Sequence, residues 1–319
     1  MKTSKGVLPK PTAASYIALA FLLCYNFVYA QQLHDSIIAA TLPYQIEIRH
    51  DNDLLMGTDY YYTAGLFFTF RKAFPNGLFS NGNEQLSFTL TQEMHTPFEI
   101  ETSDFNKMDR PYAGFLGVQG AWSYAKANHA LELGVLLGVT GSISGAGSLQ
   151  KWYHRTIISS DEPTWVGQIA NSFHTNMYAA YVYEWQWAPN PFSIYFGFHP
   201  QIALGTKDIY AQPELLLHFG KRNPISSSMA FKRVGTSELF VSIKAGYRFV
   251  GYNALLEGHL FGDSSEFTVA PEKVVFHGGI DFQWQKRNTG YFVGYRYNAA
   301  EASQTIRHQF MVFSISRRF

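Results

Sequence analysis

Apolar and polar residues alternate over many short segments of this chain. From residue 44 to 49, every second side chain is apolar and the side chains between them are polar. A period of two residues is the period of a β-strand whose two faces meet different surroundings. The same pattern recurs along the chain and predicts about twelve strands, at 44–50, 61–74, 86–91, 112–124, 130–142, 173–187, 192–204, 209–219, 239–250, 274–284, 291–298 and 307–319.

The connections between these segments alternate in length. Short turns are expected near Pro75, Lys126, Pro189 and Arg287, and long loops at 95–109, 143–171 and 252–273. Short turns at one end and long loops at the other are typical of outer-membrane barrels, which carry an even number of antiparallel strands. The polar stretch 220–237 breaks this alternation, which indicates a misplaced strand boundary there.

Composition narrows the fold class. The chain has 27 Phe and 20 Tyr, only 15% charged residues and a mean hydropathy of −0.11. Membrane helices would be far more hydrophobic, whereas a lipid-facing barrel averages apolar and polar positions. We therefore expect an all-β transmembrane antiparallel β-barrel of about twelve strands with a short helix in a long extracellular loop. A secreted, aromatic-rich β-sandwich is the alternative.

Charge and the chain ends add three expectations. The formal net charge of +1 argues against a general nucleic-acid binder, which needs an excess of clustered positive charge. Residues 1–30 have the layout of a signal peptide, with three lysines before an apolar run and cleavage expected after Ala30. The remaining residues, 31–319, are expected to form a single barrel domain. The only cysteine, Cys24, lies in the leader, so the exported chain would have no thiol chemistry.

The last expected strand ends on Phe319. A final strand that closes on a C-terminal phenylalanine is similar to the assembly signal of Gram-negative outer-membrane proteins. It implies recognition by the outer-membrane assembly machinery.

Two segments carry candidate chemistry. Residues 49–63 bring acids, an amide and a hydroxyl to the end of one strand and the start of the next. The spacing of Leu149, Trp152 and Tyr153 predicts a short helix ending near residue 158, with His154 on it. A histidine on a helix draped over the barrel mouth would be a proton acceptor. The alternatives are a packed or capping histidine, and acids that only cap a solvated turn.

Several motifs, in order, resemble the lipid A 3′-O-deacylase family of outer-membrane barrels over residues 46–171. They are His-Asp-Asn-Asp at 50–53, Gly-Thr-Asp at 57–59, Tyr-Thr-Ala-Gly at 62–65, Asp-Arg-Pro-Tyr-Ala-Gly at 109–114, the segment 150–154, and Trp165 with Gln168. The resemblance implies a twelve-stranded barrel that hydrolyses an acyl ester of lipid A at the level of the outer leaflet, with calcium as cofactor.

The resemblance also implies roles for single residues. His154 would be the general base, Asp53 a calcium ligand, and Asn52 and Thr63 would orient water, metal ligands or ester. The second acidic position of the family, six residues after the histidine, is Ser160 here, so Asp161 or Glu162 would have to complete the metal site.

Four further residues are expected to bind substrate: Arg110 and Tyr112, and Trp165 and Gln168. The arginine could contact a lipid phosphate, but a tyrosine at this place could equally mark the membrane interface. Trp165 and Gln168 could instead fix the loop.

The leading hypothesis is thus a monomeric outer-membrane hydrolase of a Gram-negative bacterium, acting on lipid A or lipopolysaccharide with calcium. One alternative is a noncatalytic barrel, either a pore or a structural protein, which Ser160 favours. The other is a serine-type outer-membrane phospholipase, although no serine stands out in the sequence as a nucleophile.

Overall fold

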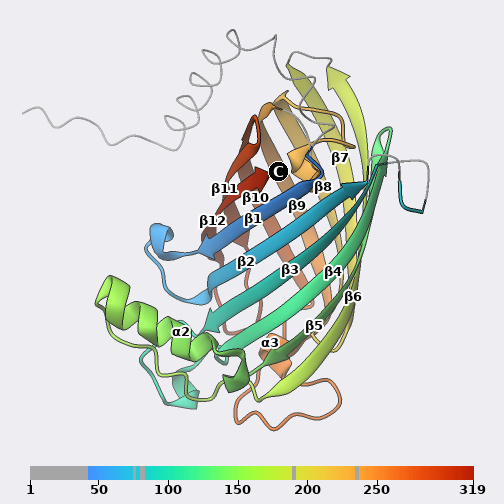
Figure 1. Ribbon diagram of the computed structural model, residues 1–319. Coiled ribbons are helices and arrows are strands. Elements are labelled where there is room, and N and C mark those ends of the chain that lie inside the picture. Colours follow the sequence, from blue (N-terminus) through green and yellow to red (C-terminus); the bar gives the residue numbers. More distant parts are fainter. Residues whose placement is uncertain (1–41, 75–76, 80–82, 189–191, 234–236) are drawn as a thin grey trace, which may run out of the picture. The chain divides into compact units, whose positions relative to one another are not determined.

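The computed structural model describes residues 42–74, 77–79, 83–188, 192–233 and 237–319. The expected signal peptide, its cleavage site and Cys24 lie outside these residues. The described residues contain twelve strands that form a closed antiparallel barrel, so the prediction of an all-β barrel is confirmed (Figure 1). The strands are β1 (Tyr44–Asn52), β2 (Tyr61–Phe74), β3 (Asn83–Thr96), β4 (Ala113–Lys126), β5 (His129–Thr140), β6 (Ser172–Ala188), β7 (Ser193–Gly205), β8 (Asp208–Lys221), β9 (Glu238–Asn253), β10 (Val274–Lys286), β11 (Thr289–Asn298) and β12 (His308–Arg318).

The barrel closes by pairing the first strand with the last. Ile48 in β1 lies opposite Ile315 in β12, and the backbone N–H of Tyr44 donates to the carbonyl of Phe319 at 3.2 Å. The Phe319 ring stacks on the ring of Tyr44, with centroids 5.8 Å apart. The C-terminal phenylalanine therefore helps to seal the seam. We call the end that holds both residues the terminal end, and the opposite one the loop end.

The alternation predicted from the sequence separates the two faces of the wall. Apolar side chains such as Ile48, Leu66, Phe68 and Ile315 are exposed on the outside. The neighbours of Ile48, Glu47 and Arg49, line the interior. An apolar outer band around a polar interior is the arrangement required of a barrel in lipid.

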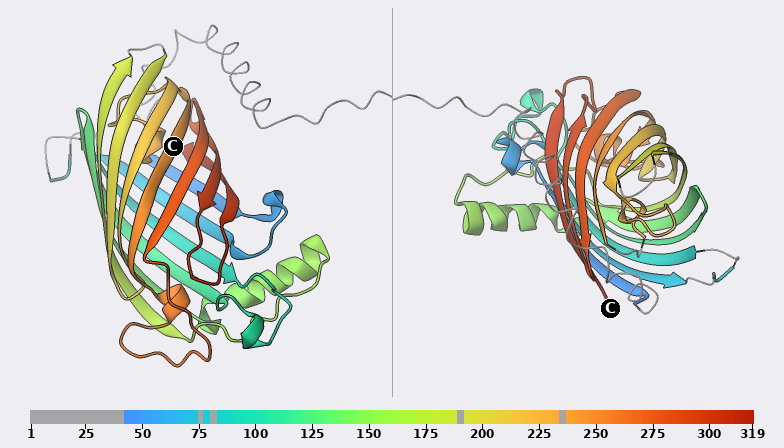
Figure 2. Two further views of the ribbon diagram at one scale, coloured as in Figure 1. Left: turned by 180° about the vertical axis from the view of Figure 1, so that it is seen from behind. Right: turned by 90° about the horizontal axis from the view of Figure 1, so that it is seen from above.

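The predicted helix exists. Helix α2 (Ala146–Tyr153) runs directly into a wider helical turn, η5 (His154–Ile158), and ends at Ser159, whose φ of +52° stops the helix. The expectation that this helix lies over the barrel mouth is wrong. In the views of Figures 1 and 2, α2 projects sideways from the loop end. A second short helix, α3 (Ala254–Glu257), was not predicted. None of the helices in the described part of the chain is long and apolar enough to cross a membrane.

The helix projects sideways because its first turn packs on the barrel wall. A Cβ atom at Gly114 in β4 would lie only 2.4 Å from the Cβ of Ala146, so the missing side chain allows this close approach. Ala146 also belongs to a buried cluster with Met94, Tyr112 and Trp165. This cluster fixes the start of α2, and the helix carries its other end beyond the wall.

Residues 220–237, which break the predicted alternation of short turns and long loops, form a long connection at the end of the barrel where the other connections are short. The β8–β9 connection lies at the terminal end, as the strand count requires, so the suspected misplacement of a strand boundary is wrong. Its described part folds into the lumen, where Arg222 donates to Glu184 at 2.8 Å and to the hydroxyl of Ser228 at 3.0 Å. We call residues 222–233 the inner plug.

Candidate functional site

The connection from β1 to β2 folds around the carboxylate of Asp53. This side chain is buried and accepts hydrogen bonds from the Thr58 hydroxyl and the Tyr60 N–H, both at 3.0 Å, and from the Thr63 hydroxyl at 3.2 Å. Gly57, with a φ of +74°, allows the tight turn between them. Burial raises the pKa of Asp53, and the nearby His308 ring and the hydrogen bond from the Tyr60 N–H oppose this effect.

Asn52 joins the two strand ends. Its amide donates to the carbonyl of Thr63 at 3.1 Å, and its carbonyl oxygen accepts from the Leu54 N–H at 2.8 Å. Both polar groups are therefore used in holding the turn.

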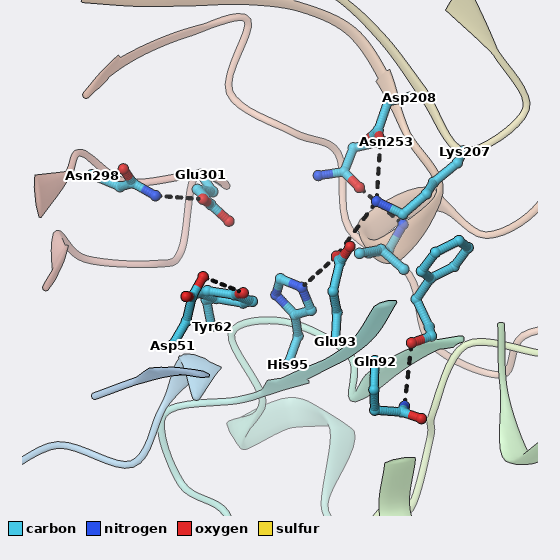
Figure 3. Close-up of polar contacts among 12 residues, drawn as sticks. Asp51, Tyr62, Gln92, Glu93, His95, Lys207, Asp208, Asn253, Asn298 and Glu301 are labelled. Atoms are coloured by element: carbon cyan, nitrogen blue, oxygen red, sulfur yellow. Dashed lines mark hydrogen bonds and ion pairs between the residues drawn. The ribbon is translucent and has the colours of Figure 1, made fainter. Parts of the chain in front are cut away.

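An irregularity at the start of β2 divides its side chains between two places. Tyr61 has a φ of +64°, and the pairing with β3 shifts between Tyr62 and Ala64. As a result Tyr62 points into the lumen and donates to Asp51 at 2.9 Å, as Figure 3 shows. Thr63 instead faces the Asp53 carboxylate.

His154 reaches the same place from α2. Its ring is buried, and its Nε2 atom lies 3.1 Å from the Oδ2 atom of Asp59. The Oδ1 atom of Asp59 accepts a 2.5 Å hydrogen bond from the Thr63 hydroxyl, which also bonds to Asp53. The structure thus brings His154, Asp53 and Thr63 together, with Asn52 at the edge of the group.

The sequence analysis missed two members of this group. Asp59 lay in a recognised motif and was given no role, although it is the residue that connects His154 to Thr63. His308, at the start of β12, has its Nε2 atom 3.6 Å from the Oδ2 atom of Asp53. No local signal marks His308, since it reaches the site only because β12 closes the barrel beside β1.

A comparison with protein families shows which family the chain belongs to. A family model described as outer membrane protein LpxR matches residues 16–319, nearly the whole chain. The chain belongs to the LpxR family. This is the lipid A 3′-O-deacylase family that the motifs resemble.

One solved structure supports the fold. LpxR from Salmonella typhimurium matches with a TM-score of 0.70 and 18% sequence identity, covering 86% of this chain and all of that chain. The β domain of the Bordetella autotransporter BrkA matches with a TM-score of 0.43 and 10% identity, covering 87% of this chain and 99% of that one. The comparison with curated proteins gives no match.

In this LpxR-family chain, three of the four expected substrate residues are buried and bound within the protein. Arg110 lies 3.6 Å from Glu301 and donates to the carbonyl of Leu255. The hydroxyl of Tyr112 donates to the carbonyl of Ile100. Trp165 donates to Gln150 at 2.8 Å. These contacts hold the three side chains within the protein, and their role in binding substrate stays a prediction.

The fourth residue, Gln168, is half-buried. It lies in a segment whose next residue, Ile169, donates its N–H to the carbonyl of Tyr112 at 2.8 Å. The buried residues therefore hold the loops under α2, and the substrate role of Gln168 stays a prediction.

The expected metal site is not assembled from the predicted residues. Glu162 is turned to Arg155, with bonds of 2.7 and 3.0 Å, and Asp161 is exposed and offers only its carbonyl, to His154. Across the described ranges, no group of three or more His, Cys, Asp or Glu side chains is placed to hold a metal ion. Asp53, Asp161 and Glu162 therefore do not fit a common calcium ion.

A separate polar cluster lies inside the barrel. Glu93 sits between His95 and Lys207, at 3.7 and 3.4 Å, and Lys207 also pairs with Asp208 at 3.1 Å (Figure 3). It borders a cavity of about 470 Å³. Because these charges compensate one another, we interpret the cluster as one that stabilises the interior of the barrel.

Proposed function

We propose that this protein hydrolyses an acyl ester of lipid A in the outer membrane. The observation that carries the proposal is the meeting of His154, Asp59, Thr63 and Asp53 at the loop end, beside the outer wall of the barrel. In an LpxR-family barrel, that group of polar side chains is the one best suited to ester chemistry.

The surroundings suit a lipid substrate. Trp152 and Ile157 on the helix and Leu54 and Leu55 in the β1–β2 connection are all exposed. Apolar side chains of this size next to the apolar outer band favour contact with acyl chains rather than water. An ester at the level of the polar head groups would then lie near His154.

The chemistry needs a proton acceptor and a water molecule. In the proposed reaction, His154 takes a proton from water, and the oxygen of that water attacks the ester carbonyl carbon. The bond between this carbon and the sugar oxygen breaks, the freed sugar oxygen takes a proton, and a fatty acid is released. No covalent intermediate with the protein is needed.

The test uses the purified barrel in detergent with lipid A, followed by mass spectrometry. We expect loss of one acyl chain, and we expect His154→Ala to lower the rate by about 10²–10⁴-fold, the usual contribution of a general base. A His154→Ala barrel that retains full activity would rule out this mechanism. The fatty acid released identifies which ester is cut.

Calcium stays a prediction from the family resemblance. Deacylation measured after treatment with a chelator, and again after calcium alone is added back, tests it. A loss that only calcium restores would require a binding site made by residues other than Asp161 and Glu162.

One observation favours a second candidate, serine-type hydrolysis. Ser160 is an exposed residue, and its hydroxyl lies 3.1 Å from the Nδ1 atom of His154. The carbonyl of Asp161 is closer to the same nitrogen, at 2.7 Å, and a carbonyl can only accept a hydrogen. Nδ1 is then a donor and cannot take the proton of Ser160. Loss of all activity in Ser160→Ala would favour the serine mechanism.

A further inference from the structure

Both nitrogens of the His154 ring have partners, and the partners differ in kind. On the Nδ1 side lie the Asp161 carbonyl and the Ser160 hydroxyl. The loop returns to this side because Ser159 ends the helix and the Ser160 N–H donates to the carbonyl of His154 at 3.2 Å. Since the closest partner is a carbonyl, Nδ1 carries the hydrogen and the ring orientation is fixed.

The Nε2 atom is therefore the one that exchanges a proton. Its partner is the Asp59 carboxylate at 3.1 Å. The His154 side chain is only 3% exposed, whereas that of Asp59 is 30% exposed. Water can thus reach this pair only from the Asp59 side.

Asp59 is itself held in place. Its Oδ1 atom accepts from Thr63, and the chain before it is fixed by the bonds of Thr58 and Tyr60 to Asp53. The carboxylate that faces His154 is therefore part of a rigid turn and not a mobile surface acid.

We infer that Asp59 is the acid partner of His154. This inference rests on the proposed function. During the reaction, the proton leaving water is shared between Nε2 and the Asp59 carboxylate, and it returns to the departing sugar oxygen. The negative charge of Asp59 stabilises the ring while it carries two hydrogens. Ser160, at the other nitrogen, is a positioning residue.

The test compares D59N, D59E, S160A and, as a matched control, D104N in deacylation assays. Asp104 is an exposed acid of the same barrel end, and its carboxylate accepts hydrogen bonds from the backbone N–H and the side-chain amide of Asn106. We expect D59N to lower kcat by about 10²–10³-fold, as for loss of an acid–base partner. D59E should recover part of the rate, and S160A should lose no more than about tenfold, the worth of one hydrogen bond. D104N should match the wild type.

The pH profile adds a readout that a purely structural role would not move. The pH–rate profile of D59N should differ from that of the wild type on its acid side, because D59N removes the negative charge that lies 3.1 Å from the Nε2 atom of His154. D59N with wild-type kcat and an unmoved acid limb would overturn the inference.

A second measurement separates this inference from the proposed function. The ¹⁵N shifts of the His154 ring report which nitrogen carries hydrogen, without any substrate. We expect D59N to change the Nε2 signal and to leave the Nδ1 signal in place. If the wild type releases no acyl chain but the Nε2 signal depends on Asp59, the proposed function fails and the pairing stands. An Nε2 signal indifferent to D59N refutes the pairing.

Discussion

The Nε2 atom of His154 and the Oδ2 atom of Asp59 lie 3.1 Å apart, although one residue belongs to the β5–β6 connection and the other to the β1–β2 connection. The strands that flank one connection do not pair with the strands that flank the other. Their meeting depends on how α2 docks on β4 and how the turn before β2 folds around Asp53. Changes at these supports should therefore alter the reaction without opening the barrel.

The docking of α2 can be disturbed at Gly114. An added Cβ there would lie 2.4 Å from both the Ala146 Cβ and the Ser144 Oγ, so Gly114→Ala should displace the start of the helix. Displacing His154 by about 1 Å can cost roughly 100-fold in rate. We expect a large fall in kcat with an intact barrel, measured by deacylation and by heat-dependent gel mobility. Gly120→Ala in the same strand is the control, because its Cβ would meet Phe88 at an ordinary 3.6 Å. Equal activity of the two variants would contradict this docking.

The Asp53 carboxylate is predicted to act through the turn it holds. Asp53→Ala removes the acceptor of three hydrogen bonds, each worth about 1.5–3 kcal/mol locally when the acceptor is charged. The turn should loosen, Asp59 should lose its position, and kcat should fall. Millimolar calcium should not restore the rate. Full recovery with calcium would show instead that Asp53 acts as a metal ligand. Hydrogen exchange over residues 53–60 checks the loosening.

The Arg110–Glu301 pair should make the loop end sensitive to acid. Burial alone would raise the pKa of Glu301, but the Arg110 guanidinium lowers it below its usual value. A lowered carboxyl pKa means that the stabilisation is present above about pH 4, the unfolded value, and is lost as the pH falls through the lowered one. Glu301→Gln leaves Arg110 buried without its counter-charge. We expect a lower Tm at pH 7. The loss in the free energy of unfolding should be smaller than the ~3–5 kcal/mol of a fully buried pair, because Glu301 is partly exposed.

The wild type also loses this charge once the pH falls through the lowered pKa of Glu301, so the difference in Tm between the two proteins should shrink as the pH is lowered to that point. A difference in Tm that stays constant down to the pH at which both proteins unfold in acid would show that the charge of Glu301 is not what matters.

The inner plug should keep the barrel from conducting ions. Arg222 is buried, bonds to Glu184 and Ser228, and stacks on Tyr195 at 4.3 Å. Arg222→Ala leaves Glu184 without this charge partner and should release the segment. We expect the wild type to be silent in planar bilayers and the variant to show openings. Arg317→Ala is the control, an exposed cation of the same barrel end that bonds to Thr289. Steady conductance by the wild type would revive the pore alternative.

The alternation of residues was enough to predict the barrel. A strand in a barrel wall meets lipid on one side and a polar interior on the other, so each residue's chemistry reports its face directly. This is why twelve strands were predicted. The helix before His154 was predicted separately, from the helical spacing of its apolar residues. Even the doubtful boundaries around residues 220–237 were predicted closely, because β8 ends at Lys221 and β9 begins at Glu238.

Local sequence patterns brought together only the site residues that lie in neighbouring segments, whereas His154 was placed with them by the family resemblance alone. Asn52, Asp53 and Thr63 come from two strands joined by one turn, so their proximity follows from the hairpin. Sequence could not show that Glu162 would turn to Arg155, or that Trp165 would be buried against Tyr112, because those contacts depend on how long loops pack. Buried position, and not residue type, decides whether a tryptophan or arginine serves a loop or a substrate.

The sequence by itself therefore determined the fold, the even strand number and the family, because these follow from local periodicity and from motifs in order. Only the tertiary structure decided which acid faces His154, that α2 projects beside the barrel, and that the β8–β9 connection enters the lumen. Each of these depends on contacts between segments distant in the chain. Such contacts are set by packing and burial in three dimensions, which a one-dimensional pattern does not encode.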